Sequence, residues 1–138
     1  MIVEVVAVGT ELLLGQIING NAAKIGTALA DHGFDAHFQV VVGDNLDRVA
    51  TAIRTATERA DAVIITGGIG PTQDDITREA VCAALGLEMM FSDSYAEFLT
   101  ERFLSWGRDM PASNLRQAEY PEGAVLLPNP KGTAPGWP

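Results

Sequence analysis

The sequence predicts an α/β fold with three layers, in which helices cover both faces of a mostly parallel sheet. Two runs of mainly β-branched and apolar residues, 2–8 and 62–66, are each followed by a glycine. Strands that are apolar on both faces are typical of the interior of a parallel sheet. Segments with helical spacing follow each run, and this alternation predicts a single domain over residues 1–138.

A further strand is predicted over residues 34–40, where apolar residues alternate strictly with polar ones. This pattern indicates one exposed face, so the strand is expected near an edge of the sheet. The helix before it is expected to begin after Asn19 or Asn21, either of which can cap it, and to end at Gly33.

Two more helices complete the alternation. One is expected to begin at Asp44 or Asn45, because apolar residues then recur at three- and four-residue spacing. The other is expected to begin near residues 72–75 and to end at Gly86, where a left-handed glycine can stop it.

The rest of the chain is less regular. A short strand is predicted over 87–91, a helix over 94–106, a short helix over 111–117 and a final strand over 124–127. The helix at 94–106 carries an aromatic stripe, which is more typical of a core or a subunit interface than of a surface that stacks bases. Residues 128–136 have the composition of a loop.

Right-handed crossovers between parallel strands predict a strand order that begins 2-1-3. The order then reverses between the first and third strands, and ligands bind outside the carboxyl ends of strands at such a point. The turns at 9–11 and 67–70 follow these two strands. Both turns are therefore expected to face one crevice.

The charge balance limits the partners. The chain has 18 acidic and 9 basic residues, a net charge of −9, which disfavours nucleic acid and anionic membranes. A phosphate ligand would therefore need backbone amides and a divalent cation, Mg²⁺ or similar, held by carboxylates. The single cysteine, Cys82, permits no disulfide framework, and the first residues lack a signal-peptide pattern, so a cytoplasmic location is expected.

The glycine-rich turn that begins at residue 67 carries the strongest functional signal. Glycines let backbone amides approach a ligand, and the start of the following helix adds positive potential. The structural alternative is a plain turn in which Thr72 or Asp74 caps the helix. Two adjacent carboxylates, Asp74 and Asp75, would however repel each other without a cation. The predicted phosphate-binding residues are Gly67, Gly68, Gly70 and Thr72, with Asp75 as the leading carboxylate.

The turns after the other two strands extend this site. Gly9 and Thr10 offer backbone groups to the same ligand, and Glu11 offers a carboxylate to a metal or a proton. Asp44 follows the second strand on the same rim. It is predicted to cap a helix, to bind the metal, or to do both.

Five sequence blocks in this order resemble the amino-terminal domain of the CinA (competence/damage-inducible) proteins. This domain is a branch of the molybdopterin-binding fold of molybdenum-cofactor biosynthesis. The blocks are 9–15, 19–21, 42–45, 67–77 and 129–136, so the resemblance spans nearly the whole chain. It implies a three-layer domain whose crevice holds the phosphate of a nucleotide or a pterin.

The resemblance also implies an activity. In the CinA-like branch the domain is associated with metal-dependent hydrolysis of ADP-ribose to AMP and ribose 5-phosphate. Asp44 and Asp75 fall on the positions of the two aspartates that serve adenylylation in the cofactor-biosynthesis branch. We expect Asp44, Asp74 and Asp75 to be catalytic and to bind the metal, and a loop with Asn129, Gly132 and Thr133 to close over the phosphate. The family commonly self-associates, so a homo-oligomer is expected.

Two alternatives stay open: adenylyl transfer to molybdopterin, and a module that binds a nucleotide without turnover. Full CinA proteins carry a further nicotinamide-nucleotide deamidase domain, to which nothing in these residues corresponds. The family's domain also normally continues past the loop at 132–136, so the chain is expected to be a shortened domain.

Overall fold

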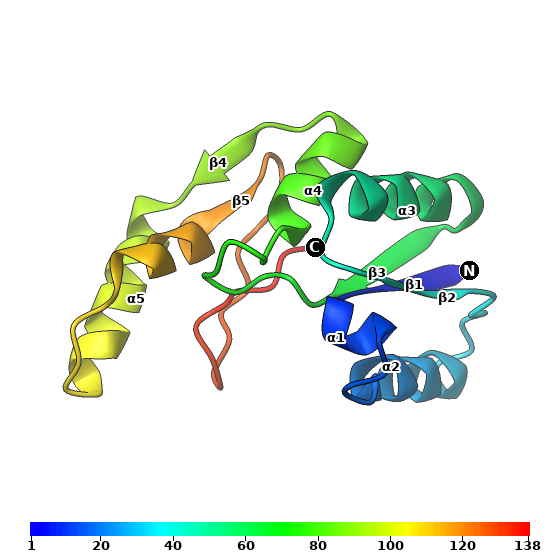
Figure 1. The fold of residues 1–138 in the computed structure, drawn as a ribbon, viewed down its shortest axis with the longest axis horizontal. Coiled ribbons are helices and arrows are strands. Elements are labelled where there is room, and N and C mark those ends of the chain that lie inside the picture. Colours follow the sequence, from blue (N-terminus) through cyan, green and yellow to red (C-terminus); the bar gives the residue numbers. More distant parts are fainter.

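A computed structural model describes residues 1–138 and shows a parallel sheet of three strands in the order β2-β1-β3 (Figure 1). The strands are β1 (Val3–Val8), β2 (Gln39–Val42) and β3 (Ala62–Thr66). Every residue of β1 is buried, as expected of a central strand. The predicted strand order is confirmed, and the carboxyl ends of all three strands lie at one edge of the sheet.

Helices cover both faces of this sheet (Figure 1). Helix α2 (Gly20–Asp31) packs on Val3 and Val5 of β1. Helices α3 (Leu46–Arg59) and α4 (Thr77–Leu85) pack on the opposite face, which carries Val6 and Val8. The three-layer prediction is therefore confirmed. None of the helices has the length and apolar composition that crossing a bilayer requires.

The predicted ends of three helices are largely confirmed. The side chain of Asn19 caps α2 and that of Asn45 caps α3, each by accepting a hydrogen bond from a backbone amide three residues ahead. Gly33, just beyond α2, and Gly86, at the end of α4, have the left-handed backbone predicted for them. A short helix, α1 (Thr10–Leu13), follows β1 directly.

The predicted start of α4 is wrong. The helix begins at Thr77, and neither Thr72 nor Asp74 caps it. The side chain of Asp75 instead folds back onto Thr72, which keeps these residues in a turn ahead of the helix. The glycine-rich segment is consequently a longer loop than the sequence pattern indicated.

The strand predicted at 34–40 begins later, at Gln39. An isolated bridge pairs Ile2 with Asp35, but the chain takes four residues from Asp35 to Gln39 against three from Ile2 to Val5. The extra residue interrupts the ladder and breaks the expected alternation.

The second half of the chain forms a smaller unit beside α4 (Figure 1). Strand β4 (Met89–Phe91) pairs antiparallel with β5 (Glu119–Pro121), and helix α5 (Asp93–Ser105) packs on the 3₁₀ helix η1 (Ala112–Ala118). The strand predicted at 124–127 is wrong, since it makes only one bridge, between Leu127 and Gly136.

The aromatic stripe of α5 divides between core and surface. Tyr95 and Leu99 are buried in a separate small core. Phe98 and Trp106 are 40% and 49% exposed, so only part of the stripe is explained by packing within the chain. A subunit interface on α5 stays a prediction.

Candidate functional site

The turns after β1 and β3 touch each other through their backbones. A Cβ atom added to Gly67 would lie 2.1 Å from the carbonyl oxygen of Val8, and Gly67 has φ +86°. Both the space and the backbone conformation therefore require glycine. This contact joins the two predicted glycine turns at the point where the strand order reverses.

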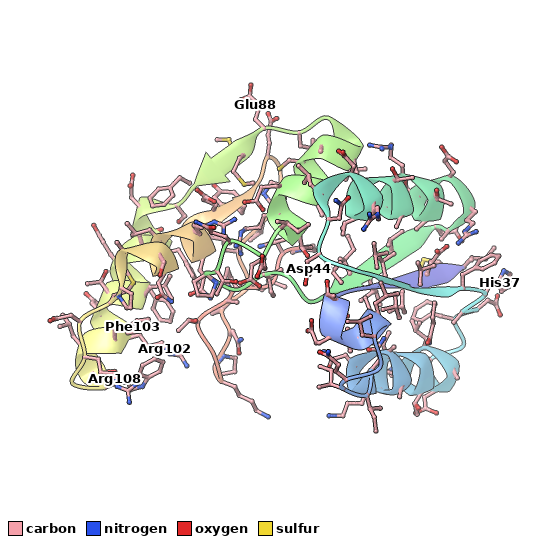
Figure 2. All side chains as sticks on the ribbon, in the orientation of Figure 1. His37, Asp44, Glu88, Arg102, Phe103 and Arg108 are labelled. Carbon is pink, nitrogen blue, oxygen red and sulfur yellow. The ribbon has the colours of Figure 1, made fainter.

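The turns after β1 and β2 are joined by two reciprocal hydrogen bonds. The amide of Thr10 donates to Asp44 Oδ2 at 3.1 Å, and the amide of Asp44 donates to Thr10 Oγ1 at 3.0 Å. Asp44 lies beside α1, at the start of the loop into α3 (Figure 2). The three turns thus form a continuous rim along the carboxyl edge of the sheet.

Asp75 is bound inside the glycine-rich loop. Its Oδ2 accepts hydrogen bonds from the amide of Thr72 at 2.8 Å and from the hydroxyl of Thr72 at 2.6 Å. Burial opposes ionisation of Asp75, but these two bonds, the amide of Gly70 and the charge of Arg78 outweigh it, so its pKa lies below the usual value. Asp75 is therefore a carboxylate at neutral pH. Its neighbour Asp74 is exposed.

The same loop folds closely onto the start of α4. Thr77 donates its hydroxyl to the carbonyl of Gly67 at 2.7 Å and its amide to the carbonyl of Gly68 at 3.0 Å. Cβ atoms on Gly68 and Gly70 would lie 2.3 Å from Thr77 Oγ1 and 2.6 Å from Asp75 Oδ2. The three predicted phosphate-binding glycines are thus all needed for the shape of the loop.

A cavity of about 310 Å³ opens between the ends of β1 and β3 and the start of α2. Its polar lining includes Glu11, Asn21 and Lys24, together with the backbone of Gly67. A larger, mainly apolar cavity of about 670 Å³ lies along β3 and α4 and includes none of the predicted catalytic carboxylates. Asp44, Asp74 and Asp75 do not line the smaller cavity either, but this cavity contacts Glu11 and the turns after β1 and β3, where a ligand is expected at the switch in strand order.

The loop at 127–136 is a hairpin that is shaped by its own side chains. Asn129 Oδ1 accepts from the amides of Lys131 and Gly132, and Asn129 Nδ2 donates to the carbonyl of Ala134. Tyr95 of α5 donates its hydroxyl to the carbonyl of Thr133. No hydrogen bond joins this hairpin to the glycine-rich loop. Its predicted role of closing over a phosphate stays a prediction.

The predicted metal ligands do not form a cage. No three His, Cys, Asp or Glu side chains come close enough together to hold a metal ion. Mg²⁺ usually binds through one or two carboxylates, substrate phosphates and water. Asp44 Oδ1 accepts none of the hydrogen bonds described above, and both bonds from Thr72 go to Oδ2 of Asp75, so these two carboxylates fit that mode of binding.

Sequence reasoning missed three basic residues. Lys24 lines the smaller cavity, Arg78 is fully buried behind the glycine-rich loop, and Arg116 of η1 donates to the carbonyl of Thr72. Two signals were available. Lys24 is a cation near the start of a helix, where a positive charge is unfavourable. Arg78 precedes Val81 by three residues, which puts it on the apolar face of its helix.

The chain matches the family model described as "Probable molybdopterin binding domain" over residues 4–137. A CinA-like protein of Frankia casuarinae is 53% identical over 96% of this chain and 32% of its own length. A CinA-like protein of a Nostoc species is 48% identical over 99% of this chain and 32% of its own length. The chain thus spans about a third of these relatives.

Solved structures agree with this match. CinA from Thermoplasma acidophilum superposes with a TM-score of 0.90 at 35% identity, over 99% of this chain and 79% of that one. MoaB from Thermus thermophilus superposes with a TM-score of 0.59 at 22% identity, over 96% of this chain and 84% of that one, which is a likeness of fold. The chain therefore belongs to the molybdopterin-binding domain family, in its CinA-like branch.

Proposed function

We propose that the carboxyl edge of the β2-β1-β3 sheet binds the diphosphate of a nucleotide and, with a divalent metal, hydrolyses ADP-ribose to AMP and ribose 5-phosphate. The observation that carries the proposal is the continuous rim made by the three turns, with one ordered carboxylate from the turn after β2 and one from the loop after β3. The family's description supports a phosphate-bearing ligand, since molybdopterin carries a phosphate.

Binding would rely on backbone amides and one lysine. Amides of the glycine-rich loop and the start of α2 supply hydrogen bonds to phosphate oxygens. Lys24, on the wall of the 310 Å³ cavity, supplies a positive charge in a chain whose net charge is −9. Leu12, Ile17 and Ile18 give the same cavity an apolar side against which a planar base can pack.

Asp44 and Asp75 would hold the metal together with oxygens of the diphosphate. When bound, a divalent cation neutralises phosphate charge and makes water a better nucleophile at neutral pH. The low pKa of Asp75 keeps this side chain ionised, which suits it to holding a cation and unsuits it to donating a proton. In the reaction a water oxygen bonds to one phosphorus and the bridging P–O bond breaks, so that the bridging oxygen leaves on the second phosphate and the proton lost by the water passes to that phosphate or to solvent.

The direct test is to incubate the protein with ADP-ribose and Mg²⁺, Mn²⁺ or neither, and to follow AMP by chromatography. We expect AMP to be released only when metal is present. The rate of AMP release by Asp75→Asn should be at least about a hundredfold lower than that of wild type. Folded wild-type protein that releases no more AMP than a metal-only blank would overturn the hydrolase proposal. Thermal unfolding of both proteins serves as the folding control.

The family's description favours a second candidate, which is binding of molybdopterin, and we propose adenylylation as the reaction that could follow this binding. In this reaction the pterin phosphate attacks the α-phosphorus of ATP and pyrophosphate leaves. Incubation with ATP and molybdopterin should then give an adenylated pterin, while ADP-ribose stays intact. Saturable AMP binding without product in either assay would instead indicate a nucleotide-binding module.

A further inference from the structure

Several carbonyl groups of the glycine-rich loop accept hydrogen bonds from side chains of α4 and η1, and two arginines donate most of these bonds. We propose that Arg78 and Arg116 are positioning residues, which hold these carbonyls away from the crevice so that the loop presents amides to an anionic ligand. The inference relies on the proposed function only in assuming that this ligand carries a phosphate.

Arg78 is buried and donates hydrogen bonds to two consecutive carbonyls of the loop. Its Nη1 donates to the carbonyl of Ile69 and its Nη2 to that of Gly70, both at 2.6 Å. The residue is 0% exposed, and no carboxylate forms an ion pair with it. A buried cation without such a partner costs stability, so its position calls for a role beyond packing.

Arg116, which belongs to η1, binds the other end of the loop. It donates to the carbonyls of Thr72 and Asp75 and forms an ion pair with Glu79 of α4. The guanidinium thus connects the turn that contains Asp75 to the helix behind it. Thr77 holds the carbonyls of Gly67 and Gly68 in the same way.

The direction of the loop carbonyls determines the direction of the loop amides. In a trans peptide the N–H points opposite to the preceding carbonyl, and this chain has no cis peptide bonds. Carbonyls of Gly67 and Gly68 that are bound by Thr77 therefore direct the amides of Gly68 and Ile69 the other way, while the amide of Gly70 is bound by the carboxylate of Asp75. Successive amides that point to one side form a concave anion-binding surface.

The unsatisfied Nε atom of Arg78 fits this interpretation. It is buried without a hydrogen-bond partner, while both terminal nitrogens reach loop carbonyls. The side chain therefore gives up one hydrogen bond in order to reach two carbonyls of the loop. Lysine carries its three donors on one rotatable nitrogen and lacks the planar pair of terminal nitrogens, so it does not reproduce the two separate contacts in this geometry.

The test compares Arg78→Lys and Arg116→Gln with wild type by residue-resolved amide hydrogen exchange without ligand, and by AMP binding with calorimetry. We expect the amides of Thr72, Asp75 and Thr77 to exchange about tenfold faster or more, because bonds from a charged donor are lost. The dissociation constant for AMP should rise by a similar factor. Amides of β1 should keep their protection.

Arg59→Lys is the matched control. Arg59 of α3 forms a bidentate ion pair with buried Glu4, near the amino end of the sheet. This variant should lose stability without changing loop exchange or AMP affinity. A merely structural role of Arg78 and Arg116 would make all three variants behave alike, and that result would overturn the inference.

Other outcomes are equally decisive. Unchanged loop exchange, or faster exchange with unchanged AMP affinity, in a folded Arg78→Lys protein would overturn the inference. Should Arg78→Lys not fold, Arg116→Gln decides by the same criteria, because its side chain is 27% exposed. Should wild type bind no AMP, the proposed function fails, while the exchange data still decide whether the arginines hold the loop.

Discussion

Thr10 and Asp44 exchange two hydrogen bonds, at 3.1 and 3.0 Å, between the carboxyl ends of β1 and β2. The pair leaves the second carboxylate oxygen of Asp44 available on the rim. Asp44 thus has two properties that mutation can separate. It accepts a hydrogen bond, which a neutral amide can also do, and it carries a charge, which an amide cannot.

Asp44→Asn should keep the fold and lose the activity. The amide oxygen can still accept from Thr10, so we expect the free energy of unfolding to change by less than about 1 kcal/mol. Without the charge, AMP release from ADP-ribose with Mg²⁺ should fall about a hundredfold or more. Urea unfolding and the AMP assay measure the two effects. Full activity of Asp44→Asn would remove Asp44 from the metal site, and Asp44→Ala shows the cost of losing the acceptor as well.

The sheet could be predicted because its signals are local. Strands β1 and β3 are continuous apolar runs, and each leads directly into glycine. The pairing of β4 with β5 could not be predicted in the same way. Strand β5 has only three residues and ends at Pro121, and it exists because a distant segment lies beside it.

The candidate site was predictable to the extent that it follows from strand ends. Asp44 comes directly after a strand and its glycine, so its place on the rim could be read from the sequence. The roles of Lys24 and Arg78 depend on which way a helix faces and on what covers it. That information is tertiary, and periodicity alone does not separate a buried arginine from a solvated one.

Gly67→Ala should destabilise the protein far more than Gly86→Ala. Both glycines have positive φ, +86° and +68°, but an added Cβ at Gly67 meets the carbonyl oxygen of Val8 at 2.1 Å, whereas Gly86 faces open space. We expect Gly86→Ala to cost about 1–2 kcal/mol from backbone strain alone. Gly67→Ala should cost more than about 3 kcal/mol, because the turn must open. Urea unfolding measures both, and equal losses would contradict the close contact between the two turns.

The hydrogen bonds to Asp75 should make stability depend on pH in the acid range. The native pKa of Asp75 is lowered, so its contribution to stability is fully present above its unfolded pKa of about 3.9 and is lost as pH falls through the native value. Thr72→Val removes the hydroxyl donor, which should raise the native pKa. The difference in urea midpoint between wild type and Thr72→Val should therefore shrink from pH 7 to about pH 3.

Thr57→Val is the control for this pH dependence. The hydroxyl of Thr57 donates to the carbonyl of Arg54, which does not titrate, so its loss should cost the same at both pH values. If the difference in urea midpoint between wild type and Thr72→Val is as independent of pH as the difference for Thr57→Val, the hydroxyl of Thr72 does not lower the pKa of Asp75.

Mutation of the two lysines of the chain tests whether the phosphate binds in the cavity or at the hairpin. Lys24 lines the 310 Å³ cavity, and Lys131 is exposed on the hairpin. Lys24→Met should raise the dissociation constant for AMP about tenfold, as expected for the loss of one charge-assisted contact. Lys131→Met should change it by less than about twofold. A larger effect at Lys131 would instead support the predicted closure of the loop with Gly132 and Thr133 over the ligand. Calorimetry at two salt concentrations measures both variants, and the Lys24 effect should weaken as salt screens the charge.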